Sequence, residues 1–245
     1  MKKSRTYGLI GKNIDYSFSQ KYFSQKFKNE NLNYTYSNFD IKSLSQIESI
    51  LQNDRISGFN VTIPFKEDII KFLDEIDEVA TAIGAVNTIK KINNKNIGYN
   101  TDCIGFEKSL LKLIDKEKPE NALILGSGGA SKAIKYVLNK LNIKYSTVSR
   151  RKGKSEFIYE NLNNEVINRF KMIINCSPVG TFPKIKDCPK IPYNSLTKDH
   201  ILYDLVYNPI ETLFLKKGRE KGCLTKNGLE MLQFQAEESW KIWEN

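Results

Sequence analysis

A glycine-rich turn near the middle of the chain has the residue types and spacing of an anion-binding site. Gly126, Gly128 and Gly129 stand between the apolar run 122–125 and a stretch, 133–141, whose apolar residues repeat at helical spacing. Glycines let a ligand lie close to the backbone, and the free N–H groups that open a helix favour a negative charge, most often a phosphate. The turn is therefore expected to bind an anion, with a plain surface turn as the alternative.

The same turn is similar to the dinucleotide-binding pattern G-x-G-x-x-G. Gly126 and Gly128 occupy the first two glycine positions, and Ser131 stands at the third. A strand before the glycines and a helix after them is the context that the pattern requires. We therefore expect a dinucleotide at this turn, although the third position departs from the pattern.

The strand expected next, Lys144–Ser149, ends in a basic run that bears on the choice of dinucleotide. Arg150, Arg151 and Lys152 follow Ser149, and no acid stands where an NAD site usually has one to bind the ribose hydroxyls. A basic residue there suits a 2′-phosphate. The sequence thus indicates NADP, and the alternative is a solvated basic turn in a basic protein.

Lys66 and Asp102 are the candidates for acid–base chemistry. Because His200 is the single histidine, no Ser-His-Asp triad or histidine pair for a metal is available, and proton transfer must fall to Lys, Asp, Glu or Tyr. Lys66 is expected at a helix N-terminus, where a cation is disfavoured, so it either points into water or has a task and a carboxylate partner. Asp102 is the candidate partner; capping a helix near Ile104 is its alternative role.

Ser17, Ser19 and Asn87 are further candidates for polar contacts with a ligand. The two serines stand at the expected start of a helix, where capping is the usual role of such hydroxyls. Two hydroxyls two residues apart could also bind a hydroxylated or carboxylated ligand. Asn87 is expected inside a strand over Ile83–Ile89, where a buried amide must find partners. On this pattern alone, Asn87 indicates a structural amide.

Length and composition indicate a globular protein of two domains. The 245 residues lie where a single core gives way to two, and 40% hydrophobic residues, with 13 Phe and 12 Tyr, suffice to fill cores. No apolar run approaches the length of a membrane span or a signal peptide, so we expect no membrane contact and a cytoplasmic location. The scattered cysteines, without C-x-x-C pairs, are expected to be reduced thiols.

The formal charge of +10 does not indicate nucleic acid as a partner. The lysines are spread along the chain, and neither a basic helix nor an aromatic-interleaved RNA motif is visible. A general attraction of anionic small molecules remains as the expected consequence of this charge.

Strand and helix signals alternate along the chain. Strands are expected at Thr6–Gly11, Asn33–Phe39, Ile56–Phe65, Ile83–Ile89, Ala122–Leu125, Lys144–Ser149, Met172–Asn175 and Ile201–Val206. Helical spacing is found near residues 22–27, 44–51, 69–76, 133–141 and 213–215, and over Asn227–Trp243. In the second half this alternation predicts a parallel doubly wound sheet, with its ligand at the carboxyl ends of the strands.

Eight stretches in sequence order resemble the shikimate dehydrogenase family. They are YGLIG at 7–11 with the Ser17-x-Ser19 pair, NVTIPFK at 60–66, GAVNT at 84–88, NTD at 100–102, LGSGGASKA at 125–133, INCSPVG at 174–180, YDLVYNP at 203–209 and GLEMLQFQAEESW at 228–240. The resemblance extends from end to end. It implies an α/β fold with an N-terminal substrate domain (1–101 and 226–245), a Rossmann-type NADP domain (102–225) and a C-terminal helix returning to the first domain.

The resemblance also implies an activity and a role for particular residues. The activity is the reversible, NADPH-dependent reduction of 3-dehydroshikimate to shikimate, a step towards chorismate and the aromatic amino acids. Lys66 and Asp102 match the catalytic pair. The substrate contacts are matched by Ser17, Ser19, Thr62, Lys66, Asn87, Asp102, Tyr207 and Gln235. The cofactor contacts are matched by Gly126, Gly128, Gly129, Ala130, Arg150, Arg151, Ser177, Val206, Gly228 and Met231, the last beside the nicotinamide. No metal is implied.

Some choices within and beyond this family stay open. The family's Asn-Arg-Thr at the adenosine phosphate is Ser149-Arg150-Arg151 here, which keeps the positive charge but leaves open which side chains bind the phosphate. A quinate/shikimate dehydrogenase with relaxed substrate or cofactor choice is one alternative. Another is a non-catalytic paralogue that binds or regulates, against which the presence of both Lys66 and Asp102 argues. A monomer and a homodimer are both compatible with the sequence.

Overall fold

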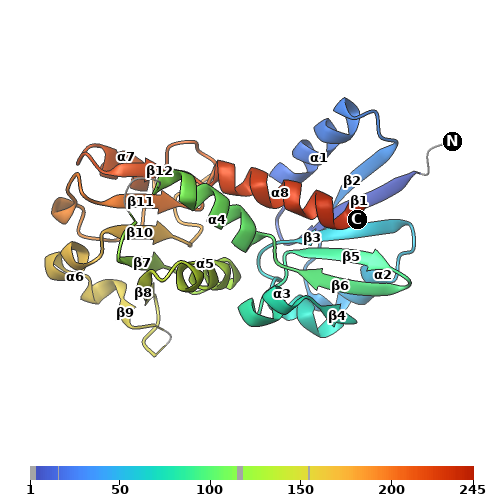
Figure 1. Cartoon of the computed structure of the whole chain (residues 1–245), viewed down its shortest axis with the longest axis horizontal. Helices are drawn as coiled ribbons and strands as arrows, with labels where there is room; N and C mark the ends of the chain where they lie inside the picture. Colours follow the sequence, from blue (N-terminus) through green and yellow to red (C-terminus); the bar gives the residue numbers. More distant parts are fainter. Residues whose placement is uncertain (1–3, 16, 115–117, 154) are drawn as a thin grey trace. The chain divides into compact units, whose positions relative to one another are not determined.

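The chain forms two compact units, which Figure 1 shows in a computed structural model. The structure describes residues 4–15, 17–114, 118–153 and 155–245. The first unit comprises Met1–Thr101 with Ala236–Asn245, and the second comprises Asp102–Gln235. The sequence-based boundary groups residues 226–235 with the first domain, whereas their contacts group them with the second unit. The last helix therefore contributes to both units.

The first unit is built on a mixed sheet. Its strands are β1 (Arg5–Gly11), β2 (Tyr34–Asp40), β3 (Ile56–Val61), β4 (Glu75–Ile76), β5 (Thr88–Ile92) and β6 (Lys95–Tyr99). In the order β2-β1-β3-β5-β6-β4, strand β1 pairs in parallel with β2 and β3, and β5 runs antiparallel to both of its neighbours. Its helices are α1 (Phe18–Asn29), α2 (Ile47–Leu51) and α3 (Glu78–Ile83).

Both faces of this sheet are covered by buried apolar side chains, as expected where parallel strands are joined by helices. One cluster contains Ile10, Phe59 and Ile89, which are fully buried. The other is largely aromatic and includes Tyr7 and Phe23 together with Trp243 from helix α8 (Leu229–Glu244). The Trp243 indole N–H donates to the carbonyl of Ile89 at 3.0 Å. The prediction that the C-terminal helix returns to the first domain is therefore confirmed.

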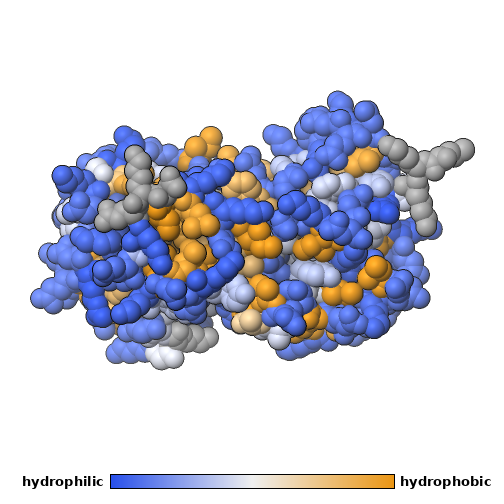
Figure 2. All heavy atoms as spheres, in the orientation of Figure 1, coloured by the Kyte–Doolittle hydropathy of each residue, from blue (hydrophilic) through white to orange (hydrophobic). Residues whose placement is uncertain are grey.

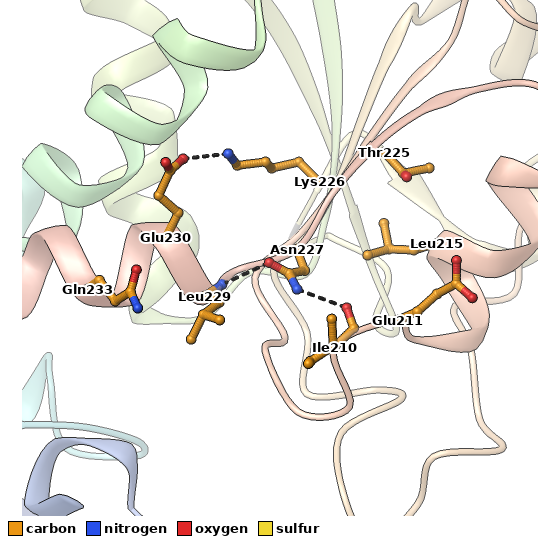
Figure 3. Close-up of a pocket in the computed structure, with 9 residues that line it drawn as sticks. All are labelled: Ile210, Glu211, Leu215, Thr225, Lys226, Asn227, Leu229, Glu230 and Gln233. Atoms are coloured by element: carbon orange, nitrogen blue, oxygen red, sulfur yellow. Dashed lines mark hydrogen bonds and ion pairs between the residues drawn. The ribbon is translucent and has the colours of Figure 1, made fainter. Parts of the chain in front are cut away.

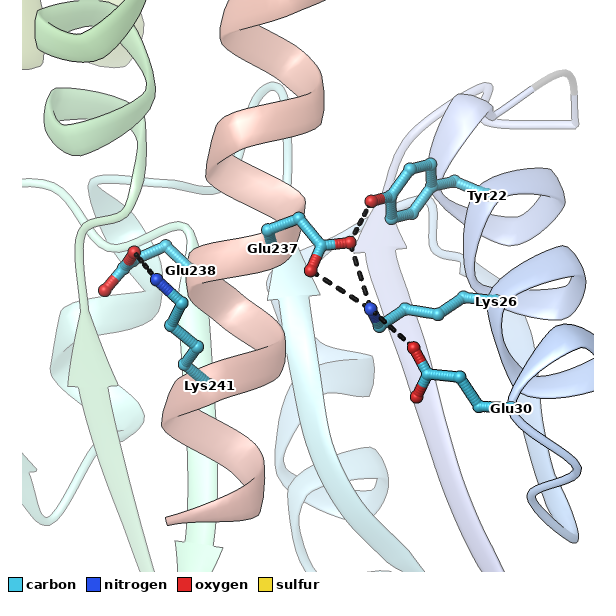
Figure 4. Close-up of polar contacts among 6 residues, drawn as sticks. All are labelled: Tyr22, Lys26, Glu30, Glu237, Glu238 and Lys241. Atoms are coloured by element: carbon cyan, nitrogen blue, oxygen red, sulfur yellow. Dashed lines mark hydrogen bonds and ion pairs between the residues drawn. The ribbon is translucent and has the colours of Figure 1, made fainter.

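A cluster of charged and phenolic groups fastens α8 to α1 (Figure 4). The ammonium of Lys26 lies 3.0 Å from the Glu237 carboxylate and 2.9 Å from that of Glu30. Tyr22 donates its hydroxyl proton to Glu237. Burial, and then the hydrogen bond to Glu237, raises the pKa of Tyr22, so the phenol stays protonated and remains a donor. This partly buried arrangement positions the last two turns of α8 on the first unit.

The predicted strand over Ile83–Ile89 is wrong at its beginning. Asp77 caps α3 by accepting from the amides of Val79 (3.0 Å) and Ala80 (3.3 Å), so this segment starts as a helix. The helix ends at Gly84, whose φ of 68° is a left-handed conformation that glycine adopts without strain. Strand β5 begins only at Thr88. Asn87 therefore lies immediately before the strand and not in its interior.

The predicted helix over residues 69–76 is also wrong in its second half. A short 3-10 helix spans Asp68–Phe72 and ends where Leu73 becomes extended. The amide of Asp74 then donates to Asn96, and β4 pairs with β6. The pairing of β4 therefore ends the helical segment after one short 3-10 helix. Lys66 lies in a turn two residues before that 3-10 helix and not at the N-terminus of an α-helix.

The second unit is built on a parallel sheet. Its strands are β7 (Asn121–Leu125), β8 (Lys144–Ser149), β9 (Phe157–Ile158), β10 (Met172–Asn175), β11 (Ile201–Asp204) and β12 (Leu224–Lys226). The order is β12-β11-β10-β7-β8-β9, and the pairs formed by these strands are parallel. Its helices are α4 (Asp102–Leu113), α5 (Gly129–Lys140), α6 (Asn164–Arg169), α7 (Leu213–Arg219) and the first part of α8. The predicted doubly wound sheet is confirmed.

The strand order of this sheet reverses between β7 and β10. Chain that leaves β7 continues to β8 on one side, whereas β10, β11 and β12 are added on the other. Open α/β sheets bind their ligands at such a switch point, outside the carboxyl ends of the strands. The glycine turn follows β7 directly, and it therefore lies at the position where this fold binds ligands.

Hydrophilic residues cover most of the surface that Figure 2 displays. Within the described residues, no helix is long and apolar enough to cross a bilayer. The described lysines and arginines are exposed or half-buried, in keeping with their spread along the sequence.

Candidate functional site

Ser17 and Ser19 lie at the start of α1. The Ser17 hydroxyl accepts from the amide of Ser19 at 3.1 Å, so Ser17 caps the helix, as its alternative role required. Ser19 is buried and lies against Tyr36 on β2, whose pKa is raised by burial and lowered in part by a hydrogen bond with Ser19. The two serines therefore differ: Ser17 caps the N-terminus of α1, and Ser19 belongs to the polar interior of the first unit.

A buried hydrogen-bond network continues from Tyr36 through the sheet. The Tyr36 hydroxyl donates to the side-chain oxygen of Asn60 at 2.8 Å. The Asn60 amide nitrogen in turn donates to Ser239 (3.0 Å) and Thr88 (3.2 Å). These groups are buried, and each would be costly to leave unpaired. Sequence reasoning missed Asn60, Thr88 and Ser239, although all three lie in the family stretches quoted above.

Asn87 is held in one orientation at the edge of this network. Its side-chain oxygen accepts from the amide of Thr101 at 2.7 Å, and its side-chain nitrogen donates to the Thr101 hydroxyl at 3.0 Å. Its backbone carbonyl accepts from Val61 at 2.8 Å. Because a backbone donor can approach only the oxygen of an amide, the positions of the Asn87 oxygen and nitrogen are fixed. The structural partners that a buried amide requires are therefore present.

Thr62 and Lys66 flank the turn that follows β3. The amide of Thr62 donates to Ile10 at 2.9 Å, and the carbonyl of Lys66 accepts from Val86 at 2.7 Å. This bond holds the backbone of Lys66 against Val86, the residue that precedes Asn87. An added Cβ at Gly11 would lie 2.5 Å from the Thr62 methyl group, so a glycine is needed where β1 meets this turn. Ser17, Ser19, Thr62, Lys66 and Asn87 all belong to the first unit.

In the second unit, the glycines after β7 serve different purposes. Gly126 has a φ of 118°, and a Cβ there would lie 3.3 Å from the backbone of Cys176, so the fold itself requires a glycine. Gly128 caps α5 with φ −87° and ψ −178°, which any residue can adopt, and a Cβ there would meet nothing within 4 Å. The open space above Gly128 is what close approach of a ligand to this turn would require.

Arg150 and Arg151 are exposed just after β8. The Ser149 hydroxyl accepts from the amide of Arg151 at 3.2 Å and orders the turn between them. An acid does lie near this strand: the Glu156 carboxylate accepts from the amide of Thr147 at 2.8 Å and from its hydroxyl. Burial acts to raise the pKa of Glu156, but these bonds lower it overall. Sequence reasoning missed Glu156, which is committed to the edge of β8.

Ser177, Val206 and Gly228 follow β10, β11 and β12, on the other side of the switch point from Arg150. A Cβ at Gly228 would lie 2.1 Å from the carbonyl oxygen of Leu205, so only glycine fits. The amide of Gly228 donates to the carbonyl of Val206 at 3.1 Å. Apart from Met231, which lies on α8, the predicted cofactor residues thus follow the carboxyl ends of β7, β8, β10, β11 and β12.

Asp102, Tyr207, Met231 and Gln235 belong to the second unit. Asp102 opens α4 and is 5% exposed, so its carboxylate is a buried polar group. Tyr207 is half-buried in the loop after β11. Met231 and Gln235 are buried on α8, and a Cβ at Gly105 of α4 would lie 2.5 Å from the Met231 carbonyl oxygen. The two helices are therefore in close contact.

A pocket of about 460 Å³ lies on the second unit beside the edge strand β12 (Figure 3). The predicted cofactor residues do not line it, although Asn227 and Leu229 flank Gly228. Its acids have partners of their own, because Glu230 binds Lys226 and Glu211 binds Arg219. In the part of the chain that the structure describes, no group of three His, Cys, Asp or Glu side chains is placed to hold a metal ion.

A parallel doubly wound sheet with a glycine turn at its switch point defines a Rossmann-type nucleotide-binding unit. Comparison with known proteins identifies the family of the whole chain. The family model of the shikimate dehydrogenase substrate binding domain matches residues 9–89. The NADP(+) shikimate dehydrogenase of Methanococcus aeolicus is 40% identical over 258 residues, covering 98% of this chain and 92% of that protein. The chain belongs to the shikimate dehydrogenase family.

Solved structures agree with this assignment. A crystal structure of a shikimate dehydrogenase in complex with NADP+ has a TM-score of 0.85 and 35% sequence identity, and the match covers 98% of this chain and 90% of that one. The quinate dehydrogenase of Corynebacterium glutamicum in complex with NAD has a TM-score of 0.85 at 26% identity, covering 98% and 93% of the two chains. The fold is thus shared by enzymes that differ in substrate and cofactor.

Proposed function

We propose that the protein is an enzyme that reversibly reduces 3-dehydroshikimate to shikimate with NADPH, on the route to chorismate and the aromatic amino acids. The observation that carries the proposal is the similarity, over nearly the full length, to NADP-dependent shikimate dehydrogenases. The first unit, which contains the matched substrate-binding region, would bind the substrate. The second unit, with its Rossmann-type sheet, would bind the cofactor.

The residues of the second unit fit NADP. The space above Gly128 is a cradle that a Cβ would fill, and it lies where the helix dipole and free amides of α5 favour a pyrophosphate. Gly126, Gly129 and Ala130 complete this turn. Arg150 and Arg151, exposed after β8, would bind the 2′-phosphate, which Arg can contact in a bidentate manner.

The nicotinamide half would then lie on the other side of the switch point. Ser177, Val206 and Gly228 follow the strands on that side, and Met231 follows Gly228 on α8. The bound cofactor would supply a hydride to the ring carbonyl carbon of the substrate. These residues would hold it and exclude water.

The substrate would be bound by groups from both units. Ser17, Ser19, Thr62 and Asn87 would contact its carboxylate and hydroxyls from the first unit, and Tyr207 and Gln235 from the second. Support for Asn87 comes from its fixed amide, which can be aimed at a ligand without reorganisation. Support for Ser19 comes from its place in the same buried network.

Lys66 and Asp102 would carry the chemistry. As hydride reaches the carbonyl carbon, negative charge develops on the oxygen, and the Lys66 ammonium would bind that oxygen and donate the proton. In the reverse direction the neutral amine would take the proton from the alcohol. Asp102 would position the ammonium and accept from a neighbouring hydroxyl of the substrate.

Initial rates with each substrate and cofactor test this proposal. The purified protein is assayed for reduction of NADP+ or NAD+ with shikimate or with quinate, by nicotinamide absorbance. Shikimate with NADP+ should give the highest kcat/KM of the four pairs. A preference for quinate or for NAD+ would favour the relaxed enzyme instead, and absence of turnover with all four pairs would favour a non-catalytic paralogue.

A further inference from the structure

Asp204, at the end of β11, is a fully buried carboxylate without an assigned role in the reaction. One of its oxygens accepts from the side-chain amide of Asn175 at 2.9 Å and from the backbone amide of Val206 at 3.0 Å. The other accepts from the hydroxyl of Thr212 at 2.6 Å. These three donors are neutral, and they come from three different segments of the second unit.

Asn175 extends the influence of Asp204 to the loop that follows β10. Its side-chain nitrogen also donates to the carbonyl of Val179 at 3.3 Å. Its side-chain oxygen accepts from the amide of Ser177 at 3.1 Å and from the Ser177 hydroxyl at 2.6 Å. Because Asp204 accepts from one end of this amide, the other end must present its oxygen to Ser177. Asp204 therefore acts together with the Ser177 amide and the Val179 carbonyl to hold Asn175, and Asn175 connects Asp204 to the Ser177 loop.

Val206 and Thr212 extend the same influence to the loop after β11 and to α7. The carbonyl of Val206 accepts from Gly228, which joins the loop after β12 to this assembly. The Thr212 hydroxyl, while donating to Asp204, accepts from the amide of Leu215 at 3.3 Å and caps α7. The segment 205–212 is thus fixed at its beginning and its end by one carboxylate.

A carboxylate suits this position better than any neutral side chain. Its two oxygens accept several bonds and need no donor in return, so it can gather donors from three segments. The cost is a buried charge, which burial opposes by raising the pKa of Asp204 to about 6 and which the three hydrogen bonds partly offset. A group that is costly to bury and is bound only to loop and cap donors is better explained by the geometry of those loops than by stability.

We propose that Asp204 is a positioning residue that holds the loops of Ser177, Val206 and Gly228 in the arrangement that receives the nicotinamide half of the dinucleotide. The inference rests on the proposed function, because it takes these loops to contact the cofactor. These bonds do not connect Asp204 to Arg150, which follows β8, or to the amides of the glycine turn after β7. Loss of Asp204 should therefore weaken one half of the cofactor site and spare the other.

Calorimetric titration of the full-length protein with two ligands tests this inference. The ligands are NADP+ and 2′-phosphoadenosine diphosphoribose, which has the adenosine half but no nicotinamide. Asp204→Ala should raise the Kd for NADP+ roughly tenfold, the value of about one lost hydrogen bond, and change the Kd for the fragment less than about twofold. Asp204→Asn keeps one acceptor oxygen and can donate to Thr212, so it should restore NADP+ binding to within about threefold.

A matched control separates positioning from general loss of stability. The hydroxyl of Tyr203, the preceding residue, donates to Ser109 on α4 at 2.9 Å and, among the described residues, its side chain has no hydrogen bond to these loops. Tyr203→Phe removes one buried hydrogen bond and should lower the Tm without changing either Kd. Amide hydrogen exchange should accelerate in segments 176–180 and 205–212 of Asp204→Ala, but not in Tyr203→Phe.

Two results with Asp204→Ala would contradict the inference. Equal weakening of NADP+ and the fragment in Asp204→Ala would mean a merely structural role, and unchanged NADP+ binding would mean no role. If Asp204→Ala does not fold, Asn175→Ala disconnects the Ser177 loop alone and must show the same selective loss. If the unmodified protein binds neither ligand, the proposed function fails as well; if it binds both, only the inference on Asp204 is at stake.

Discussion

At the scale of single residues, Gly126 and Gly128 separate what the fold requires from what a ligand requires. Gly126 has a positive φ and backbone atoms in its way, whereas Gly128 has neither. A glycine that the backbone does not need is expected to be kept for the space above it. The two positions, two residues apart, therefore allow the cofactor proposal to be tested independently of folding.

We expect Gly128→Ala to weaken NADP+ binding without loss of stability, and Gly126→Ala to lower the stability of the fold. Gly128→Ala should leave the free energy of unfolding unchanged or raise it by up to about 1 kcal/mol, because alanine restricts the unfolded chain. Its Kd for NADP+ should nevertheless rise at least roughly tenfold, since the added methyl group occupies the cradle. Gly126→Ala should destabilise the protein by roughly 1–3 kcal/mol. Urea unfolding and NADP+ titration measure both effects; unchanged NADP+ affinity in Gly128→Ala would remove the glycine turn from the cofactor site.

Replacement of Lys66 tests the proton transfer. Lys66→Met keeps the bulk of the side chain but removes the charge that would act only as hydride arrives. The kcat should fall by about a hundredfold to ten-thousandfold, with little change in KM. Lys71→Met, at a lysine whose side chain is 74% exposed, is the matched control and should retain normal rates. Near-normal kcat in Lys66→Met would leave Tyr207 or Asp102 as the proton source to examine.

The buried carboxylate of Asp204 predicts a pH dependence of stability. Burial raises its pKa from 3.8 to about 6, so between these values the folded chain binds a proton that the unfolded chain has released. Its contribution to the free energy of unfolding therefore falls as pH rises from about 4 to about 6, by roughly 3 kcal/mol at most. The neighbouring Cys176 and Tyr193 have pKa values raised by burial, and both stay neutral throughout this window.

The difference between two urea-unfolding series measures this dependence. Asp204→Asn cannot ionise, and the other carboxylates contribute equally to both proteins. The stability of the unmodified protein relative to Asp204→Asn should decline as pH rises from 4 to 6 and then level off. A difference that stays flat would show that folding leaves the pKa of Asp204 unchanged, and one that grows with pH would show that folding lowers it; either result would contradict the prediction.

At the scale of elements, the end of α8 is attached to the first unit by polar as well as aromatic contacts. Ser239 is fully buried and lies within hydrogen-bond distance of Asn60 (3.0 Å), Thr88 (2.8 Å) and Thr101 (3.1 Å). Thr101 in turn holds the amide of Asn87. Through this hydroxyl cluster, the last helix therefore supports Asn87, a proposed substrate residue.

Ser239→Ala should destabilise the protein and weaken substrate binding. The lost hydroxyl leaves buried groups with one partner fewer, which costs roughly 1–3 kcal/mol in the free energy of unfolding. The KM for shikimate should rise because the Thr101 hydroxyl, to which the Asn87 side chain donates, loses its contact with Ser239, whereas the KM for NADP+ should not change. Ser45→Ala, at an exposed serine that contacts Ser43, is the control and should change none of these quantities. An unaltered unfolding midpoint in Ser239→Ala would contradict the importance of this cluster.

The sequence predicts the elements best where a local signal and the tertiary structure agree. The glycine turn, β7 and α5 are right because apolar periodicity and glycine mark the same boundaries. The strand predicted from Ile83 is wrong because an Asp77 cap and a Gly84 terminator make a helix of an apolar run that fits either structure. The hairpin of β5 and β6 was not predicted, although its turn has a local signal. That signal is the pair Asn93-Asn94, because asparagine tolerates the positive φ angles that both residues adopt in this turn.

The candidate site divides in the same way. Lys66, Asp102 and the glycines can be singled out from charge, spacing and elimination. Asn60, Thr101, Ser239 and Asp204 could not, because their roles come from partners distant in sequence; Asn60 and Ser239, for example, are separated by 179 positions. A buried polar group is recognised by what surrounds it, and periodicity alone does not identify those neighbours.

At the scale of the whole molecule, the proposed reaction needs both units. Ser17, Ser19, Thr62, Lys66 and Asn87 belong to the first unit, whereas Asp102, Tyr207, Gln235 and the glycine turn belong to the second. Neither unit would carry the complete set, and α8 contributes residues to both. One chain would therefore bind the dinucleotide and the polyhydroxy acid together and transfer hydride between them.

The most direct test of this claim follows the transferred hydrogen itself. The purified protein is incubated with 3-dehydroshikimate and NADPH in which both C4 hydrogens of the nicotinamide are deuterium, and the product is analysed by mass spectrometry. The account predicts shikimate that carries deuterium on the carbon of the new alcohol, in an amount equal to the NADP+ formed. Shikimate without deuterium, or oxidation of the cofactor without shikimate, would contradict it.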